Sequence, residues 1–247
     1  AEAMSRHTMD VDNIHWPTNS NYIGDSNSST DFWNYDAKES VATPYLGIGR
    51  RHAKQQWTSL LSAHVWVQGW LSSYYLTGYH RGLDVAKQTA DTYTNRIWGD
   101  HGVTGRRLYL SVWNMVEVWD ATKDPKYLVD LQDRVDRMLK LQNGPEQYNS
   151  LVIDRYGYAQ VYVSKGLYKY YKLTGDEKIK TALIRHARAL RDNPPWNHAY
   201  ESYLSTIHSL IVGYELSGEA SFLNEAISRA AFLKTDQLKS SFEEIGN

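Results

Sequence analysis

Residues 170–179, with the sequence YYKLTGDEKI, contain the pattern that decides the fold of this chain. The same pattern recurs in YYLTGYHRGL (74–83), VWDATKDPKYL (118–128) and GYELSGEASFL (213–223). It consists of an aromatic residue followed by Thr or Ser, usually by Gly, and soon by an apolar residue. When the copies are aligned on Thr77, Thr122, Thr174 and Ser217, their spacings are 45, 52 and 43 residues. Such periods are typical of stacked helical hairpins. The sequence therefore predicts four hairpins, each turning at one copy.

The segments on the two sides of each turn differ in character. After each turn, apolar residues recur at steps of three or four, as in Ile179, Leu183, Ala187 and Leu190, which predicts an amphipathic helix. Before each turn, segments such as LYLSVWNMVEVW (108–119) are apolar nearly all round, which is typical of helices enclosed on every side. Inner helices ringed by amphipathic outer helices explain this alternation better than an open solenoid does. We expect an all-α fold.

Composition limits the classes of function. The chain has 247 residues, 42% of them apolar, and a net charge of −1, which predicts a globular domain without the basic face that nucleic acid requires. No apolar run approaches the ~20 residues of a membrane span. We expect no leader, and because the first residue is Ala1 we expect a mature or truncated form. Nine Trp and 19 Tyr against four Phe favour half-wet aromatic surfaces, on which sugars stack.

The alternation, its period and the turn pattern resemble the (α/α) toroids of carbohydrate-active enzymes, namely the six-hairpin glycosidases and the toroid polysaccharide lyases. RHTMDVDNIHW (6–16) and PYLGIGRRHAKQQW (44–57) are similar to lyases of the rhamnogalacturonan exolyase type. The resemblance implies a toroid domain over residues 50–247, after an irregular segment over residues 1–49. About four hairpins imply an incomplete toroid, or the later part of one that another domain or chain completes. The resemblance also implies a secreted or periplasmic enzyme.

The segments that enter the four inner helices (47–57, 99–110, 150–162 and 194–204) are rich in Arg, His and Tyr. In a toroid they share one rim, where helix N-termini add partial positive charge and favour an anion such as an acidic polysaccharide. β-Elimination on a uronate needs a group that neutralises the carboxylate, a base for the C5 proton and an acid for the departing O4. Toroid lyase sites commonly combine Asn, His, Tyr and Arg, so the resemblance implies the same residue types.

These requirements give the candidate site. The predicted catalytic residues are Tyr156, Tyr158, His52, His198, Arg51 and Arg155. The predicted substrate-binding residues are Asn13, His15, Trp16, Trp33, Arg50, Arg107, Trp196 and Glu201. A tyrosine base needs cationic neighbours to lower its pKa from ~10, and Arg155 next to Tyr156 offers one. Structural roles, such as ion pairs for the arginines and core packing for the tyrosines, are the alternatives.

Two other functions stay open. A glycoside hydrolase needs a pair of carboxyl groups, and the candidates are Glu117, Asp120, Asp154, Glu201, Asp10 and Asp12. Glu117 and Asp120 are expected near the turn end of an inner helix, away from the arginine-rich rim. A non-catalytic helical-repeat module that binds carbohydrate or protein is the second alternative. No cofactor or metal is expected, since DVDN (10–13) does not continue as a calcium loop and the phosphate-binding and zinc motifs are missing.

The remaining histidines and the leading segment complete the expectations. His64 and His208 fall in apolar inner helices, where a hydrogen-bonded core histidine is expected and a position lining the lumen is the alternative. His80 and His186 are expected at the surface. The irregular N-terminal segment is aromatic rather than disordered in composition, and we interpret it as a substrate-binding loop or as a strap over helix ends.

Overall fold

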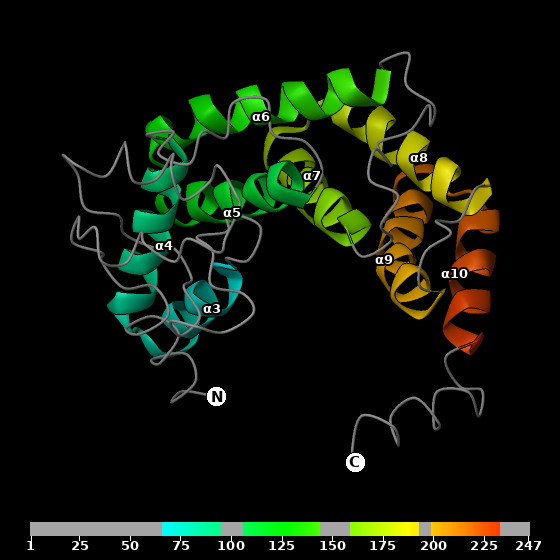
Figure 1. Ribbon diagram of the computed structural model, residues 1–247, viewed down its shortest axis with the longest axis horizontal. Helices are drawn as coiled ribbons and strands as arrows, with labels where there is room; N and C mark the ends of the chain where they lie inside the picture. The colour runs from blue at the N-terminus through cyan, green and yellow to red at the C-terminus, as the bar shows by residue number, and fades with distance from the viewer. Residues whose placement is uncertain (1–65, 95–105, 144–158, 193–198, 233–247) are drawn as a thin grey trace, which may run out of the picture. The chain divides into compact units, whose positions relative to one another are not determined.

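The structure is a computed structural model that describes residues 66–94, 106–143, 159–192 and 199–232 (Figure 1). These residues form eight helices and no strand, and the all-α fold class is therefore confirmed for this part of the chain. The helices are α3 (Gln68–Thr77), α4 (His80–Thr94), α5 (Arg106–Thr122), α6 (Pro125–Asn143), α7 (Gln160–Thr174), α8 (Glu177–Asp192), α9 (Ala199–Ser217) and α10 (Ala220–Phe232). The predicted segment 1–49 and its boundary lie outside the described residues.

The helices pair into four hairpins whose turns fall at the predicted positions. In each turn, the hydroxyl of the aligned Thr or Ser donates a hydrogen bond of 2.6–2.9 Å to the carbonyl four residues earlier. The same oxygen accepts a bond of 3.1–3.3 Å from the N–H two residues later. One side chain thus satisfies main-chain groups on both sides of the turn, which explains why Thr or Ser recurs there.

The residue after the hydroxyl ends each inner helix in the left-handed conformation. It is Gly78, Gly175 or Gly218 in three turns, with φ of 68–73°, and Lys123 in the other, with φ of 55°. Its N–H bonds to the carbonyl four residues earlier at 2.7–2.8 Å in every copy. Glycine suits this position because a side chain there is strained, and only Lys123 departs from the pattern.

Replacing Lys123 with glycine is expected to raise the free energy of unfolding by up to about 1 kcal/mol, because a left-handed non-glycine residue is strained. The ammonium forms an exposed 2.6 Å ion pair with Asp120, and such pairs contribute little. Lys123→Ala is the matched control, since it removes the ammonium and keeps the strain. Urea denaturation of both variants measures the difference, and equal stability of the two would contradict the role given to strain. Gly175→Ala is expected to lower stability by about the same amount.

By their contacts, the residues divide into two compact units, Ala1–Arg134 and Val135–Asn247, and each is described by itself. In the first unit, α3 packs on α4 and α5, and α4 also packs on α5. In the second unit, α9 packs on α7, α8 and α10, and α7 also packs on α8. In each unit, the inner helix of one hairpin therefore contacts the inner helix of the next.

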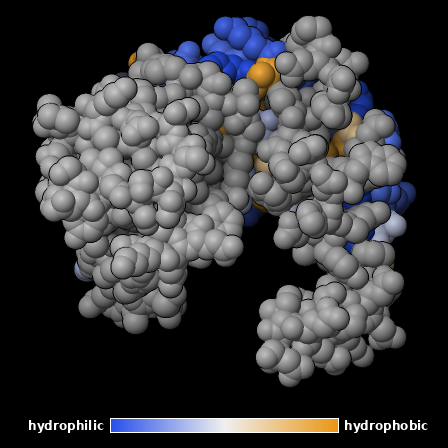
Figure 2. All heavy atoms as spheres, in the orientation of Figure 1, coloured by the Kyte–Doolittle hydropathy of each residue, from blue (hydrophilic) through white to orange (hydrophobic). Residues whose placement is uncertain are grey.

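Burial follows the predicted alternation only in part. All five residues from Leu108 to Val112 on α5 are buried, so this inner helix is enclosed as predicted, and the visible surface of the outer helix α6 is mostly hydrophilic (Figure 2). The prediction that every inner helix is enclosed on all sides is wrong for α3, α7 and α9. Leu173 on α7 is exposed. Leu76 on α3 is 85% exposed, and Ile211 and Tyr214 on α9 are also exposed. The helices that pack on α9 therefore leave Ile211 and Tyr214 exposed.

In each of two outer helices, a buried arginine forms hydrogen bonds that join the helix to its neighbours. In the first unit, Arg134 on α6 donates from Nε to Asp130 Oδ2 at 2.6 Å, from Nη1 to Ser111 Oγ at 2.9 Å and from Nη2 to the Tyr93 carbonyl at 3.2 Å. The bonds reach α6, α5 and the C-terminal end of α4. The arginine thus bonds to a main-chain carbonyl in the last turn of α4, where carbonyls generally need a donor from outside the helix.

Arg229 on α10 repeats this arrangement in the second unit. Its guanidinium donates to Glu225 Oε1 at 2.8 Å, to Thr206 Oγ1 at 2.6 Å and to the Leu190 carbonyl at 2.8 Å. Both arginines lie twelve residues after the hydroxyl residue of their turn, and their three partners also occupy equivalent positions. The repeat therefore extends beyond the turn into the packing between hairpins.

In the third hairpin the same position holds His186, which is fully buried on α8. The prediction that His186 lies at the surface is wrong, whereas His80 is exposed as expected. His186 continues the apolar stripe at three residues after Leu183 and four before Leu190, and both of these are buried. Neither ring nitrogen has a hydrogen-bond partner of good geometry among the described residues. Burial lowers the pKa of His186 to about 3, and the nearby main chain of Gln160 raises it slightly.

Candidate functional site

Most of the residues predicted for the site lie outside the described parts of the chain. These are Tyr156, Tyr158, His52, His198, Arg51, Arg155, Asn13, His15, Trp16, Trp33, Arg50 and Trp196. Arg107 and Glu201 lie in the first turns of α5 and α9, at the N-terminal ends of inner helices as predicted. The two helices belong to different units, and each unit is described by itself.

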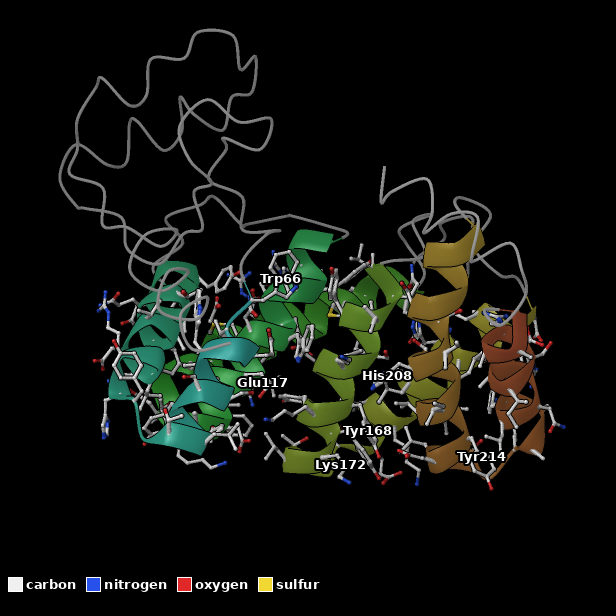
Figure 3. The ribbon with its side chains drawn as sticks, turned by 90° about the horizontal axis from the view of Figure 1, so that it is seen from below. Trp66, Glu117, Tyr168, Lys172, His208 and Tyr214 are labelled. Atoms are coloured by element: carbon white, nitrogen blue, oxygen red, sulfur yellow. The ribbon has the colours of Figure 1, made fainter. Side chains whose placement is uncertain are left out.

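The described part of the second unit carries a polar and aromatic surface on the inner helices α7 and α9. The two helices run in the same direction, because Ser164 bonds to His208 and, further along both, Tyr168 bonds to Glu215. The α7–α9 face is defined by Lys165, Tyr168 and Lys172 on α7 and by His208 and Glu215 on α9, all half-buried or exposed. Figure 3 shows Tyr168 and His208 in the space between the two helices.

His208 is the titratable group at the centre of this face. Its Nδ1 lies 2.8 Å from the hydroxyl oxygen of Ser164, a buried residue on α7. Burial is the main cause that lowers the pKa of His208, the positive charge of Lys165 lowers it further, and Glu215 opposes both. The imidazole is therefore neutral at pH 7, the form in which it accepts a proton.

Tyr168 has the opposite character. Its hydroxyl donates a 2.7 Å hydrogen bond to Glu215 Oε2, and the ammonium of Lys172 lies 5.5 Å from the centre of its ring. Burial, together with the bond to the Glu215 carboxylate, raises the pKa of Tyr168 to about 12. Tyr168 is therefore a proton donor at neutral pH and is unsuited to be a base.

The first unit holds the carboxyl groups that were considered for hydrolysis. Glu117 and Asp120 lie in the last two turns of α5, as predicted. Trp113 Nε1 donates to Glu117 Oε1 at 3.1 Å, and Lys123 forms an ion pair with Asp120. Each carboxylate thus has a partner of its own, an indole N–H for Glu117 and an ammonium for Asp120.

Asn114 belongs to a buried polar network in the same unit. Its Oδ1 accepts bonds from the Val67 N–H at 3.3 Å and from Gln68 Nε2 at 3.1 Å, and its Nδ2 donates to Tyr93 Oη at 3.2 Å. The network connects the N-terminal end of α3 with α4 and α5. Since Asn114 and Tyr93 are buried, the network stabilises the packing of the hairpins.

Sequence reasoning considered His208 but assigned it no role, and it did not single out Lys165, Tyr168 or Glu215. The signal for the lysines and the tyrosine was present, because residues 165, 168 and 172 are spaced by three and four residues in a helix otherwise rich in apolar and aromatic residues. That spacing places them on one side of α7. The partner on α9 has no such local signal, since Ser164 and His208 are 44 residues apart.

The described residues contain no group of three or more His, Cys, Asp or Glu that could hold a metal ion. None of the helices described has both the length and the apolar character to cross a membrane. Comparisons of the chain with protein-family models, curated proteins and solved structures gave no match.

Proposed function

We propose that this chain is a polysaccharide lyase that cleaves a uronic-acid-containing polysaccharide by β-elimination. The observation that supports the proposal is the α7–α9 face, where two lysines, a neutral histidine and a protonated tyrosine share one surface. A uronate needs a cation beside its carboxylate and a base beside C5. We also propose that the hairpins belong to an (α/α) toroid.

The chemical roles follow from the properties of each group. Lys165 and Lys172 neutralise the substrate carboxylate, which makes the C5 proton more acidic. His208 takes that proton, the electrons of the C5–H bond form the C4–C5 double bond, and the C4–O4 bond breaks. The departing O4 takes a proton from Tyr168, whose pKa of about 12 keeps it protonated until this step.

The residues assigned from the sequence are part of the same proposal. Arg155, Tyr156 and Tyr158 directly precede α7 in the chain, and Trp196 and His198 directly precede α9. Both groups are therefore attached to the N-terminal ends of the two helices that form the face. We propose that an extended substrate runs along the face toward these ends. The residues predicted as catalytic from the sequence, Arg155, Tyr156, Tyr158 and His198, then bind neighbouring sugars together with Trp196, because the proposed base and acid are His208 and Tyr168.

Elimination is favoured over hydrolysis by the groups on the face. A hydrolase of the usual kind needs one carboxylic acid and one carboxylate on opposite sides of the scissile bond. Glu215 is the carboxylate that defines this face, and it accepts the hydrogen bond from Tyr168. The lysines, the histidine and the tyrosine instead supply the three functions that elimination requires.

The proposal is tested by incubating the full chain with pectic, ulvan-like and glycosaminoglycan polymers while ultraviolet absorbance is recorded. We expect absorbance from the unsaturated uronate to rise with at least one polymer. New reducing ends without absorbance would replace the proposal with a hydrolase. Binding without either product would replace it with a non-catalytic module.

His208→Ala is expected to lower kcat/KM at least 100-fold, since a positioned base typically contributes this much. The acid limb of the wild-type pH profile should lie below ~6.5, because burial and Lys165 lower the pKa of His208. His80→Ala is the matched control, because the same change at an exposed histidine on α4 should leave the rate unchanged. Circular dichroism checks that both variants are folded. A wild-type rate for folded His208→Ala would remove His208 from the reaction.

A further inference from the structure

The hydroxyl group of Ser164 makes two contacts but has only one hydrogen to donate. Its oxygen lies 3.2 Å from the Val161 carbonyl, which can only accept, and 2.8 Å from His208 Nδ1, which can accept or donate according to the tautomer. A serine in a helix commonly donates to the carbonyl three or four residues earlier. Both contacts are hydrogen bonds only if Ser164 donates to Val161 and His208 donates from Nδ1 to Ser164.

We infer that Ser164 is a positioning residue that holds His208 as the neutral Nδ1–H tautomer, so that Nε2 is the ring nitrogen that accepts a proton. Ser164 is completely buried on α7, whereas His208 is half-buried on α9, so water does not compete for the serine oxygen. In a neutral imidazole the nitrogen that lacks hydrogen is the acceptor, and the bond made by the other nitrogen selects it.

The surroundings of the ring agree with this assignment. Lys165 on α7 and Glu215 on α9 are the charged groups that act on His208, and they have opposite effects on its pKa. Their charges determine how readily the ring is protonated, while the Ser164 hydroxyl determines which nitrogen carries the hydrogen of the neutral form. The catalytic meaning of Nε2 rests on the proposed lyase function, but the tautomer itself is a property of the protein alone.

The experiment is a long-range proton–nitrogen NMR spectrum of the full chain with nitrogen-15 histidine at pH 7.5. The His208 signals are identified by their loss in His208→Gln. We expect Nε2 of wild-type His208 at the shift of an unprotonated ring nitrogen and Nδ1 at the shift of a protonated one. In Ser164→Ala, the Nε2 resonance should move toward the protonated range, because the Nδ1–H form loses its acceptor.

Ser209→Ala is the matched control. Ser209 is also buried, it is next to His208 in α9, and its hydroxyl lies 3.5 Å from the Gln160 carbonyl, so its loss should leave the His208 signals unchanged. A protonated Nε2 in the neutral wild-type ring would overturn the inference, and so would identical His208 spectra for wild type and Ser164→Ala. The wild-type spectrum decides the tautomer even if Ser164→Ala does not fold. If the spectra are as expected but no polymer yields an unsaturated product, the inference about the tautomer stands and the proposed lyase function is refuted.

Discussion

Replacing Arg134 with methionine is expected to lower the free energy of unfolding by about 3–5 kcal/mol, the usual effect of removing one partner from a buried ion pair. Methionine fills part of the space but donates no hydrogen bond. Asp130, which is only 9% exposed, would lose its ion pair, and the Tyr93 carbonyl would lose a donor at the end of α4. Urea denaturation followed by circular dichroism measures the change.

Two further variants separate the effect of the buried hydrogen bonds of Arg134 on stability from the effect of its charge. Lys126 lies on α6, as Arg134 does, and forms an ion pair of 2.7 Å with Asp91 on α4. Both side chains are at least 40% exposed, so Lys126→Met is expected to lower the free energy of unfolding by less than about 1 kcal/mol. Arg134→Lys keeps the charge but cannot reach three acceptors at once, and it should recover only part of the stability. Equal stability of Arg134→Met and Lys126→Met would show that the three buried hydrogen bonds contribute little.

The second large effect is the loss of stability that His186 causes in acid. Burial lowers the pKa of the folded-state ring to about 3, whereas the unfolded chain has the ordinary value of ~6.5. Below pH ~6.5, the unfolded state therefore takes up a proton that the folded state does not. The free energy of unfolding falls as pH falls through this window, by about 2 kcal/mol at pH 5.

The test compares wild type with His186→Leu, which has an apolar side chain at the same buried position. At pH 7.5 the two should differ modestly, whereas at pH 5 the wild type should lose about 2 kcal/mol more than the variant. Urea denaturation gives the total change, and hydrogen exchange of α8 peptides locates it. His80→Leu, at an exposed histidine, is the control and should follow wild type. The same pH dependence in wild type and His186→Leu would contradict a neutral, buried His186.

Helix α8 shows what the helical period predicts correctly and where the interpretation of His186 went wrong. The periodicity that predicted α8 placed Leu183 and Leu190 on the buried face, and His186 lies between them on the same stripe. The interpretation of His186 as a surface residue relied on its place in an outer helix rather than on its position in the apolar period of that helix. The repeat gave a second signal, since the equivalent residues in α6 and α10 are buried arginines.

The candidate site was only partly accessible to sequence reasoning. The positions of Arg107 and Glu201 at the beginnings of inner helices followed from where the turns lie, and the structure confirms them. The α7–α9 face did not follow, because it depends on which sides of two helices meet. Tyr168 and Glu215 are 47 residues apart, and no local spacing predicts their 2.7 Å hydrogen bond.

The sequence by itself determined the helices and the four turns of this protein. Turn chemistry is local, since a hydroxyl that bonds four residues back and a left-handed residue after it need only their own neighbours. The tertiary structure alone decided that Arg134 caps α4, that His186 is enclosed and that Ser164 meets His208. Those contacts depend on how hairpins pack side by side, and a helical period gives the buried side of a helix without naming the residue that lies against it.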